Sequence, residues 1–179
     1  GLNPAAAQEL SDAGIDKYLG QFTPVSSVDV GDGWTKHTFD TAAGSGPICI
    51  AGTPYSVFTR EGKSNRLLIF EQGGGACWQD FYNCNIRAED QEPPAPREGI
   101  WDFDSHDNPF ADYSIVYMPY CDGSVFNGDN DVFDLNWQAY LETVIGLPPG
   151  TGPVIRFHRG VRNQSAGMDL AREMFPNAS

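Results

Sequence analysis

Arg66-Leu67-Leu68-Ile69-Phe70-Glu71-Gln72-Gly73-Gly74-Gly75-Ala76-Cys77 is the stretch that decides the fold. Its first half is a continuous apolar run, which is typical of a strand buried on both faces in a parallel sheet. Its second half places three consecutive glycines directly after that strand. Glycine permits turns that side chains forbid and leaves backbone amides open to an approaching ligand atom. The stretch therefore predicts a core strand that ends in a loop with open backbone donors.

Other strand and helix patterns surround this core strand. Residues 114–118 form a second strong apolar strand, and residues 34–39, 55–60 and 154–157 are shorter strand candidates. Residues 4–20 contain a short peripheral helical stretch, and an amphipathic helix begins at Gly160 and ends at Pro176. The proline-rich residues 89–98 indicate an exposed loop. Together these segments predict an α/β fold, with a mostly parallel sheet and flanking helices.

Composition limits the classes of function. The chain has 179 residues with 40% hydrophobic content, enough for one sizeable core. Its net charge of −13 argues against a nucleic-acid binder or a polybasic membrane anchor. No apolar run is long enough to cross a bilayer. Neither a Walker lysine nor a G-x-G-x-x-G spacing accompanies the glycines, which disfavours a phosphate loop, and we expect no cofactor.

The four cysteines favour disulfides over a metal site. Cys77 and Cys84 are seven residues apart, Cys49 and Cys121 stand alone, and no nearby histidine completes a tetrahedral zinc set. A 77–84 bridge with a 49–121 bridge is the simplest of the three possible pairings. An oxidising compartment follows, so we expect a secreted or periplasmic protein.

The order of several motifs resembles the pectin acetylesterase and Notum carboxylesterase family of α/β-hydrolases. In that family a strand ends in Leu-Glu-Gly-Gly-Gly-Trp-Cys or a close variant. A second cysteine, an Asn-Pro pair and a strand ending in Pro-Tyr-Cys then follow. The matching segments here are residues 70–77, Cys84, Asn108-Pro109-Phe110, residues 118–129 and residues 158–163. Ala76 replaces the family's tryptophan, Trp78 stands two residues further on, and Gln72 precedes the glycines; these departures concern the acyl pocket more than the fold.

The resemblance implies ester hydrolysis by Ser, His and Asp, with the serine in a Gly-x-Ser-x-Gly elbow. By position, the backbone amides of Gly74 and Gly75 would be the oxyanion donors, and the same likeness supports the 77–84 and 49–121 disulfides. The residues expected to bind substrate are Ala76, Trp78, Tyr120 and Asp122. The alternative reading of the glycines is a tight turn that needs them for steric reasons alone.

We expect residues 1–179 to be the N-terminal part of a single α/β-hydrolase domain that ends just before the nucleophile strand. The amphipathic helix that begins at Gly160 should lead into another parallel strand, so the C-terminal remainder of the hydrolase is the predicted partner, present as a second chain. That remainder would supply Ser, Asp and His. Ser165, in Asn163-Gln164-Ser165-Ala166-Gly167, lies inside the predicted helix and not on a sharp turn after a strand, so it is not the expected nucleophile.

The histidines and the acidic stretch have ordinary interpretations. His37, His106 and His158 are expected to have structural or solvent roles, because the base of the triad follows the serine in chain order. Residues 129–134 offer oxygen ligands for calcium, but without the glutamate of an EF-hand; turn capping is favoured and no metal is expected.

The predicted function is hydrolysis of carboxylic esters, with the acetyl groups of a polysaccharide such as pectin as the favoured substrate. A polyester depolymerase or a protein deacylase would use the same machinery with another pocket. A secreted carbohydrate-binding module without catalytic activity is the alternative from a different class.

Overall fold

The computed structural model describes residues 3–20, 22–40, 44–88 and 98–178. In chain order the elements are α1 (Pro4–Asp12), η1 (Ile15–Tyr18), β1 (Ser26–Gly31), β2 (Trp34–Thr38), β3 (Ser56–Arg60), β4 (Leu67–Glu71), β5 (Gly75–Trp78), β6 (Phe81–Cys84), η3 (Gly99–Trp101), β7 (Ser114–Met118), β8 (Asn130–Phe133), α2 (Leu135–Ile145), β9 (Ile155–His158) and α3 (Gly160–Met174). The predicted strands and the two predicted helical segments are confirmed. The loop expected over residues 89–98 lies, except for its last residue, outside the described residues.

The central sheet is mixed. Its strand order is β1-β2-β3-β7-β4, and all neighbouring pairs are antiparallel except β7 and β4. The α/β class is confirmed, but the prediction of a mostly parallel sheet is wrong. Connection length explains the pairing of β1 with β2, because a tight hairpin can join only antiparallel strands. A parallel pair needs a crossover of a dozen or more residues. The chain between β4 and β7 provides one.

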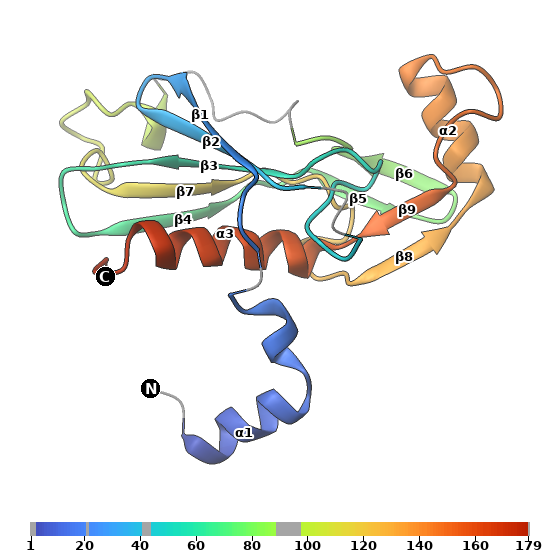
Figure 1. Ribbon diagram of the computed structural model, residues 1–179. Coiled ribbons are helices and arrows are strands. Elements are labelled where there is room, and N and C mark those ends of the chain that lie inside the picture. Colours follow the sequence, from blue (N-terminus) through green and yellow to red (C-terminus); the bar gives the residue numbers. More distant parts are fainter. Residues whose placement is uncertain (1–2, 21, 41–43, 89–97, 179) are drawn as a thin grey trace.

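The core lies on both faces of β7, whose residues are all buried. Val116 and Met118 contribute to the cluster that α3 covers, where a Cβ on Gly167 would lie only 2.1 Å from the Met118 sulfur. Ile115 and Tyr117 belong to an aromatic cluster that also contains Trp101 of η3. Figure 1 shows α3 running along the sheet, α1 standing away from it, and α2 beside β8 and β9. The two faces of β7 therefore anchor the fold.

β4 differs from its prediction. The strand forms one edge of the sheet, and in the part of the chain that the structure describes nothing pairs with its outer side. None of its residues is fully buried, and the Ile69 side chain is 38% exposed. The expectation of burial on both faces is therefore wrong for this chain. A short apolar run does not by itself distinguish a central strand from an edge strand.

Candidate active site

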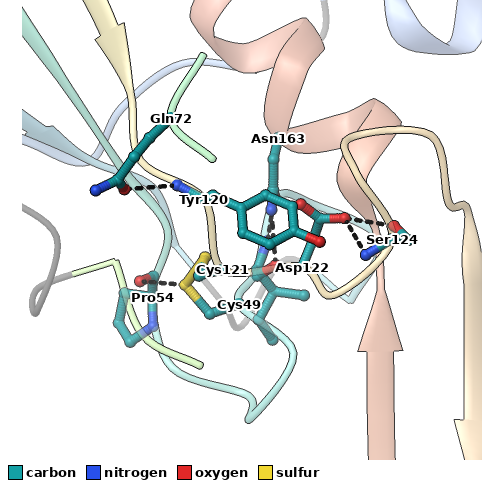
Figure 2. The surroundings of a disulfide bond; sticks show 9 residues. Cys49, Pro54, Gln72, Tyr120, Cys121, Asp122, Ser124 and Asn163 are labelled. Carbon is teal, nitrogen blue, oxygen red and sulfur yellow. Dashed lines mark hydrogen bonds between the residues drawn. A yellow bond between two sulfur atoms is a disulfide. The ribbon is translucent and has the colours of Figure 1, made fainter. Parts of the chain in front are cut away.

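The glycine segment begins where β4 ends, beside the end of β7. The Gln72 amide donates to the carbonyl oxygen of Met118 at 3.0 Å, which continues the pairing of β4 with β7. The side-chain oxygen of Gln72 accepts a hydrogen bond from the Tyr120 amide at 3.1 Å, as Figure 2 shows. Gln72 therefore ties the start of the glycine loop to the turn that follows β7.

Two of the three glycines have no room for a side chain. A Cβ on Gly74 would lie 2.3 Å from the Tyr120 ring and 2.5 Å from the Asn85 amide nitrogen. Gly75 has a φ of +82°, and a Cβ there would lie 2.0 Å from the carbonyl oxygen of Asn83. A Cβ on Gly73 would meet nothing within 4 Å. The steric reason for glycine therefore holds at positions 74 and 75.

The backbone amides of Gly74 and Gly75 differ in their relation to the β5–β6 hairpin. Asn85 donates to the Gly74 carbonyl at 2.8 Å, which makes these two residues a hydrogen-bonded antiparallel pair. Hydrogen-bonded and non-hydrogen-bonded pairs alternate, so Gly75, opposite Cys84, belongs to a pair that exchanges no backbone bonds. No backbone acceptor among the described residues takes the Gly74 amide. The pairing therefore directs the Gly75 amide away from β6, whereas Gly74 pairs with Asn85; the assignment of the two amides as oxyanion donors stays a prediction.

The turn after β7 forms the support for this loop. Asp122 is completely buried, and its Oδ2 accepts from the Ser124 amide at 2.8 Å, from the Ser124 hydroxyl and from the Phe126 amide at 3.3 Å. These bonds hold a turn in which Val125 and Phe126 have left-handed φ values of 56° and 57°. Burial raises the pKa of Asp122, although hydrogen bonds from Ser124 and Phe126 oppose the shift.

Tyr120 connects the turn with the glycines. Its ring lies against Gly74, and its hydroxyl oxygen accepts from the Val125 amide at 3.0 Å. Burial raises the pKa of Tyr120 to about 12, so the phenol stays neutral. The buried, neutral Tyr120 ring thus packs between the glycine loop and the turn after β7.

The predicted substrate-binding residues differ in exposure. Tyr120 and Asp122 are buried, Ala76 is partly buried, and Trp78 is 56% exposed. Substrate contact stays a prediction for all four. The structure gives Tyr120 and Asp122 supporting contacts, whereas Trp78 is open to solvent.

Both predicted disulfides are present. Cys77–Cys84 closes the β5–β6 hairpin directly after the glycines, and Cys49–Cys121 joins residues 48–50 to the turn after β7. Nearby, the buried side chain of Asn163 accepts from the Ile48 amide at 2.9 Å and donates to the Ile48 carbonyl at 3.1 Å. Sequence reasoning missed Asn163 and Gln72 as supporting residues. The position of Gln72, directly before the glycines, was the available signal.

Ser165 and the histidines are engaged in structural contacts. Ser165 lies inside α3, and its hydroxyl donates to the Val161 carbonyl at 2.8 Å, an ordinary bond along the helix. His37 is buried, with its ring nitrogens 2.8 Å from the hydroxyls of Ser27 and Thr59. His158 contacts the Asp122 carbonyl at 3.0 Å. These contacts agree with the interpretation that Ser165 is not the nucleophile; His106 is exposed in its loop.

The acidic stretch pairs with arginines. Asp131 binds Arg159 through two hydrogen bonds, and Asp129 pairs with Arg162. Residue Asp134 caps α2 and forms a buried ion pair with Arg156 at 3.3 Å. No group of three or more potential metal ligands occurs among the described residues. The oxygens considered for calcium are therefore occupied by guanidinium and amide donors.

A disulfide-bonded α/β scaffold with a glycine loop at the end of a core strand is what the resemblance to carboxylesterases predicts. A sequence model of the family described as Pectinacetylesterase matches residues 33–142, more than half of the chain. The chain belongs to the pectinacetylesterase family. The resemblance proposed from the motifs is thereby confirmed.

Three relatives are palmitoleoyl-protein carboxylesterases. The chain is 31% identical to notum1a of Danio rerio over 108 residues, which cover 54% of this chain and 21% of that protein. It is 28% identical to notum1' of Xenopus laevis and 28% identical to NOTUM of Mus musculus, over 54% of this chain and 22% and 21% of those proteins. The matched part thus spans about a fifth of each relative's length. No helix in the described ranges is long and apolar enough to cross a membrane.

Proposed function

We propose that this chain supplies the oxyanion loop of a secreted or periplasmic serine carboxylesterase that removes acetyl groups from a polysaccharide such as pectin. The observation that carries the proposal is the placement of the Gly74 and Gly75 amides. They lie just after the edge strand β4, on a loop held against Tyr120; Gly75 belongs to a pair that exchanges no backbone bonds with β6, and no backbone acceptor among the described residues takes the Gly74 amide.

These amides fit the chemistry of acyl transfer. When a serine attacks an ester carbonyl, negative charge develops on the carbonyl oxygen, and fixed backbone donors stabilise it without having to reorganise. Loss of one such donor typically lowers the rate by about 100-fold to 1,000-fold. The Tyr120 ring and the Asn85 side chain border the loop at Gly74, and the glycines themselves add no side chain beyond a hydrogen atom.

The serine, acid and base would come from the C-terminal remainder of the hydrolase, present as a second chain. The outer side of β4 is the proposed position of its first strand, because this edge is apolar, lacks a partner among the described residues and leads directly into the glycine loop. A parallel strand paired there would end beside Gly74, which brings a serine at its end close to the amides.

The relatives favour a second candidate substrate. All three are named palmitoleoyl-protein carboxylesterases, so removal of an acyl chain from a protein is the alternative use of the same machinery. The replacement of the family's tryptophan by Ala76 leaves more space beside the amides, which a longer acyl group would fill.

Two measurements test the proposal. Purification followed by native and intact mass analysis should reveal a second chain that begins just before a Gly-x-Ser-x-Gly segment; a lone monomer of 19.6 kDa would refute the two-chain arrangement. The complete protein should react with a fluorophosphonate probe and hydrolyse p-nitrophenyl acetate faster than long-chain esters. Faster hydrolysis of long-chain esters would favour deacylation of proteins. Carbohydrate binding without labelling or turnover would instead identify a binding module.

A further inference from the structure

The hairpin that follows the glycine loop has two different faces. Side chains alternate across a strand, so Cys77 and Tyr82 share one face while Trp78 and Phe81 share the other. The first face belongs to the core, where Cys77 packs with Trp137. The second face is the outer one, and polar residues are expected there. It carries two large aromatic rings instead.

These rings form a flat, exposed platform. Trp78 is 56% exposed and Phe81 is 41% exposed. Their ring centroids are 4.2 Å apart with an interplanar angle of 16°, so they stack. Clustered exposed apolar side chains on a soluble protein commonly mark a binding surface.

The platform is held rigidly. The Cys77–Cys84 disulfide closes the hairpin behind the rings. In the turn of the hairpin, Asp80 accepts from Asn136 at 2.7 Å, and on β6 Tyr82 donates to Asp134 at 2.8 Å. The two hydrogen bonds fix the hairpin against the start of α2 and the disulfide joins its two strands, so a ligand would not have to order the rings when it binds.

Trp78 of the platform lies on β5, the strand that begins at Gly75, one of the two proposed oxyanion donors. Trp78 is three residues from Gly75, which corresponds to about 10 Å along an extended strand. Ala76 lies between them on the outer face and adds only a methyl group. Asn83, opposite Ala76, and Gln79, at the tip, are exposed and offer amide groups beside the rings. The outer face of the hairpin therefore extends from the proposed donor amides at one end to the Trp78 and Phe81 rings at the other.

We propose that Trp78 and Phe81 bind a sugar ring of an esterified, low-charge polysaccharide and so position a neighbouring acetyl group at Gly74 and Gly75. This inference rests on the proposed esterase function of the same site. A sugar ring presents a C–H face to an aromatic ring and hydroxyl groups at its rim, which match the platform and its flanking amides. Because the chain carries a net charge of −13, it repels an ionised polyuronate, so esterified pectin fits better than polygalacturonate.

The test uses the protein purified together with any second chain. Binding to acetylated, methyl-esterified pectin and to polygalacturonate is measured by affinity electrophoresis at one fixed salt concentration. We expect the esterified polymer to bind and polygalacturonate to bind more weakly. Trp78→Ala and Phe81→Ala should each weaken binding by roughly 10-fold. Trp78→Phe, which keeps a flat ring, should retain most of it, and Phe133→Ala, which removes a 65% exposed ring from β8, should have no effect.

A second readout separates this inference from the proposed function. The ester p-nitrophenyl acetate is too small to reach from the amides to the platform, so Trp78→Ala should raise KM for acetylated pectin far more than KM for p-nitrophenyl acetate. Phe133→Ala, outside the platform, should change neither value. Absence of any hydrolysis, with binding that still depends on the rings, would overturn the esterase proposal and retain a binding platform. Pectin binding that is the same in all variants would overturn the platform. So would a change in oligomeric mass in Trp78→Ala, because it would show that protein covers the rings.

Discussion

The two disulfides should contribute very different amounts of stability, although both lie close to the glycine loop. Cys49–Cys121 closes a loop with a sequence separation of 72 residues, and Cys77–Cys84 closes one of 7 residues. In the chain-entropy description, the stabilisation grows with the logarithm of the loop length. It gives about 4 kcal/mol for the long loop and about 2 kcal/mol for the short one. The expected difference is therefore about 2 kcal/mol.

The measurement compares Cys49→Ala/Cys121→Ala with Cys77→Ala/Cys84→Ala in urea unfolding followed by circular dichroism without reductant. The short pair is a matched control, because both variants lose two sulfur atoms from buried or partly buried positions. If the long-loop variant does not fold in buffer, both series are measured in sucrose, which strengthens burial. Equal losses in the two variants, or a larger loss in the 77–84 variant, would refute this reasoning.

Three further predictions concern single residues near the site. Gly75→Ala should lower ester hydrolysis by the complete protein more than 10-fold, because its φ is +82° and Asn83 leaves no space, whereas Gly73→Ala should retain activity. Asp134→Ala should cost about 3–5 kcal/mol in urea unfolding, since it leaves the buried Arg156 unpaired; Asp131→Ala, at a pair whose carboxylate is 40% exposed, should cost about 1 kcal/mol or less. Burial lowers the pKa of His37, so the unfolded chain binds the proton more readily. The free energy of unfolding should then fall as pH drops below 6.5, and His37→Gln should reduce that slope; an unchanged slope in His37→Gln would contradict this assignment.

Local patterns predicted five of the strands and two helical stretches, but not their neighbours, and they missed β1, β5, β6, β8 and α2. The apolar runs identified β4 and β7, and the amphipathic pattern that begins at Gly160 identified α3. Pairing direction depends on which segments are adjacent in space, and the apolar character of β4 does not show that it lies at an edge. The sequence therefore predicted a mostly parallel sheet, whereas in the sheet that the described residues form one pair, β4 and β7, is parallel.

In the candidate site, too, local features could be predicted and contacts between distant segments could not. The glycines and the cysteine pairing could be predicted because their spacing is local or matches a known order of motifs. The role of Asn163 could not, because its amide side chain reaches the backbone of a distant segment; for Gln72, which acts in the same way, the position before the glycines was the one signal. Hydrogen bonds of this kind leave no periodic signal in a single sequence.

Three links hold the turn at residues 119–123 against the glycine loop and its surroundings. The Tyr120 amide donates to Gln72, which lies just after β4; Cys121 forms a disulfide with Cys49; and the Cys77 amide donates to the Gly123 carbonyl at 2.9 Å. An oxyanion donor is effective only when it is already in place as charge develops, so freedom in the loop would cost rate even with both amides present. Gly123 has a φ of +68°, and a Cβ there would lie 2.6 Å from Ile50 and 3.0 Å from Cys77. A side chain at position 123 would thus displace both the β5–β6 hairpin, through Cys77, and the core, through Ile50. We therefore expect the turn, more than the glycine loop itself, to determine where the Gly74 and Gly75 amides lie.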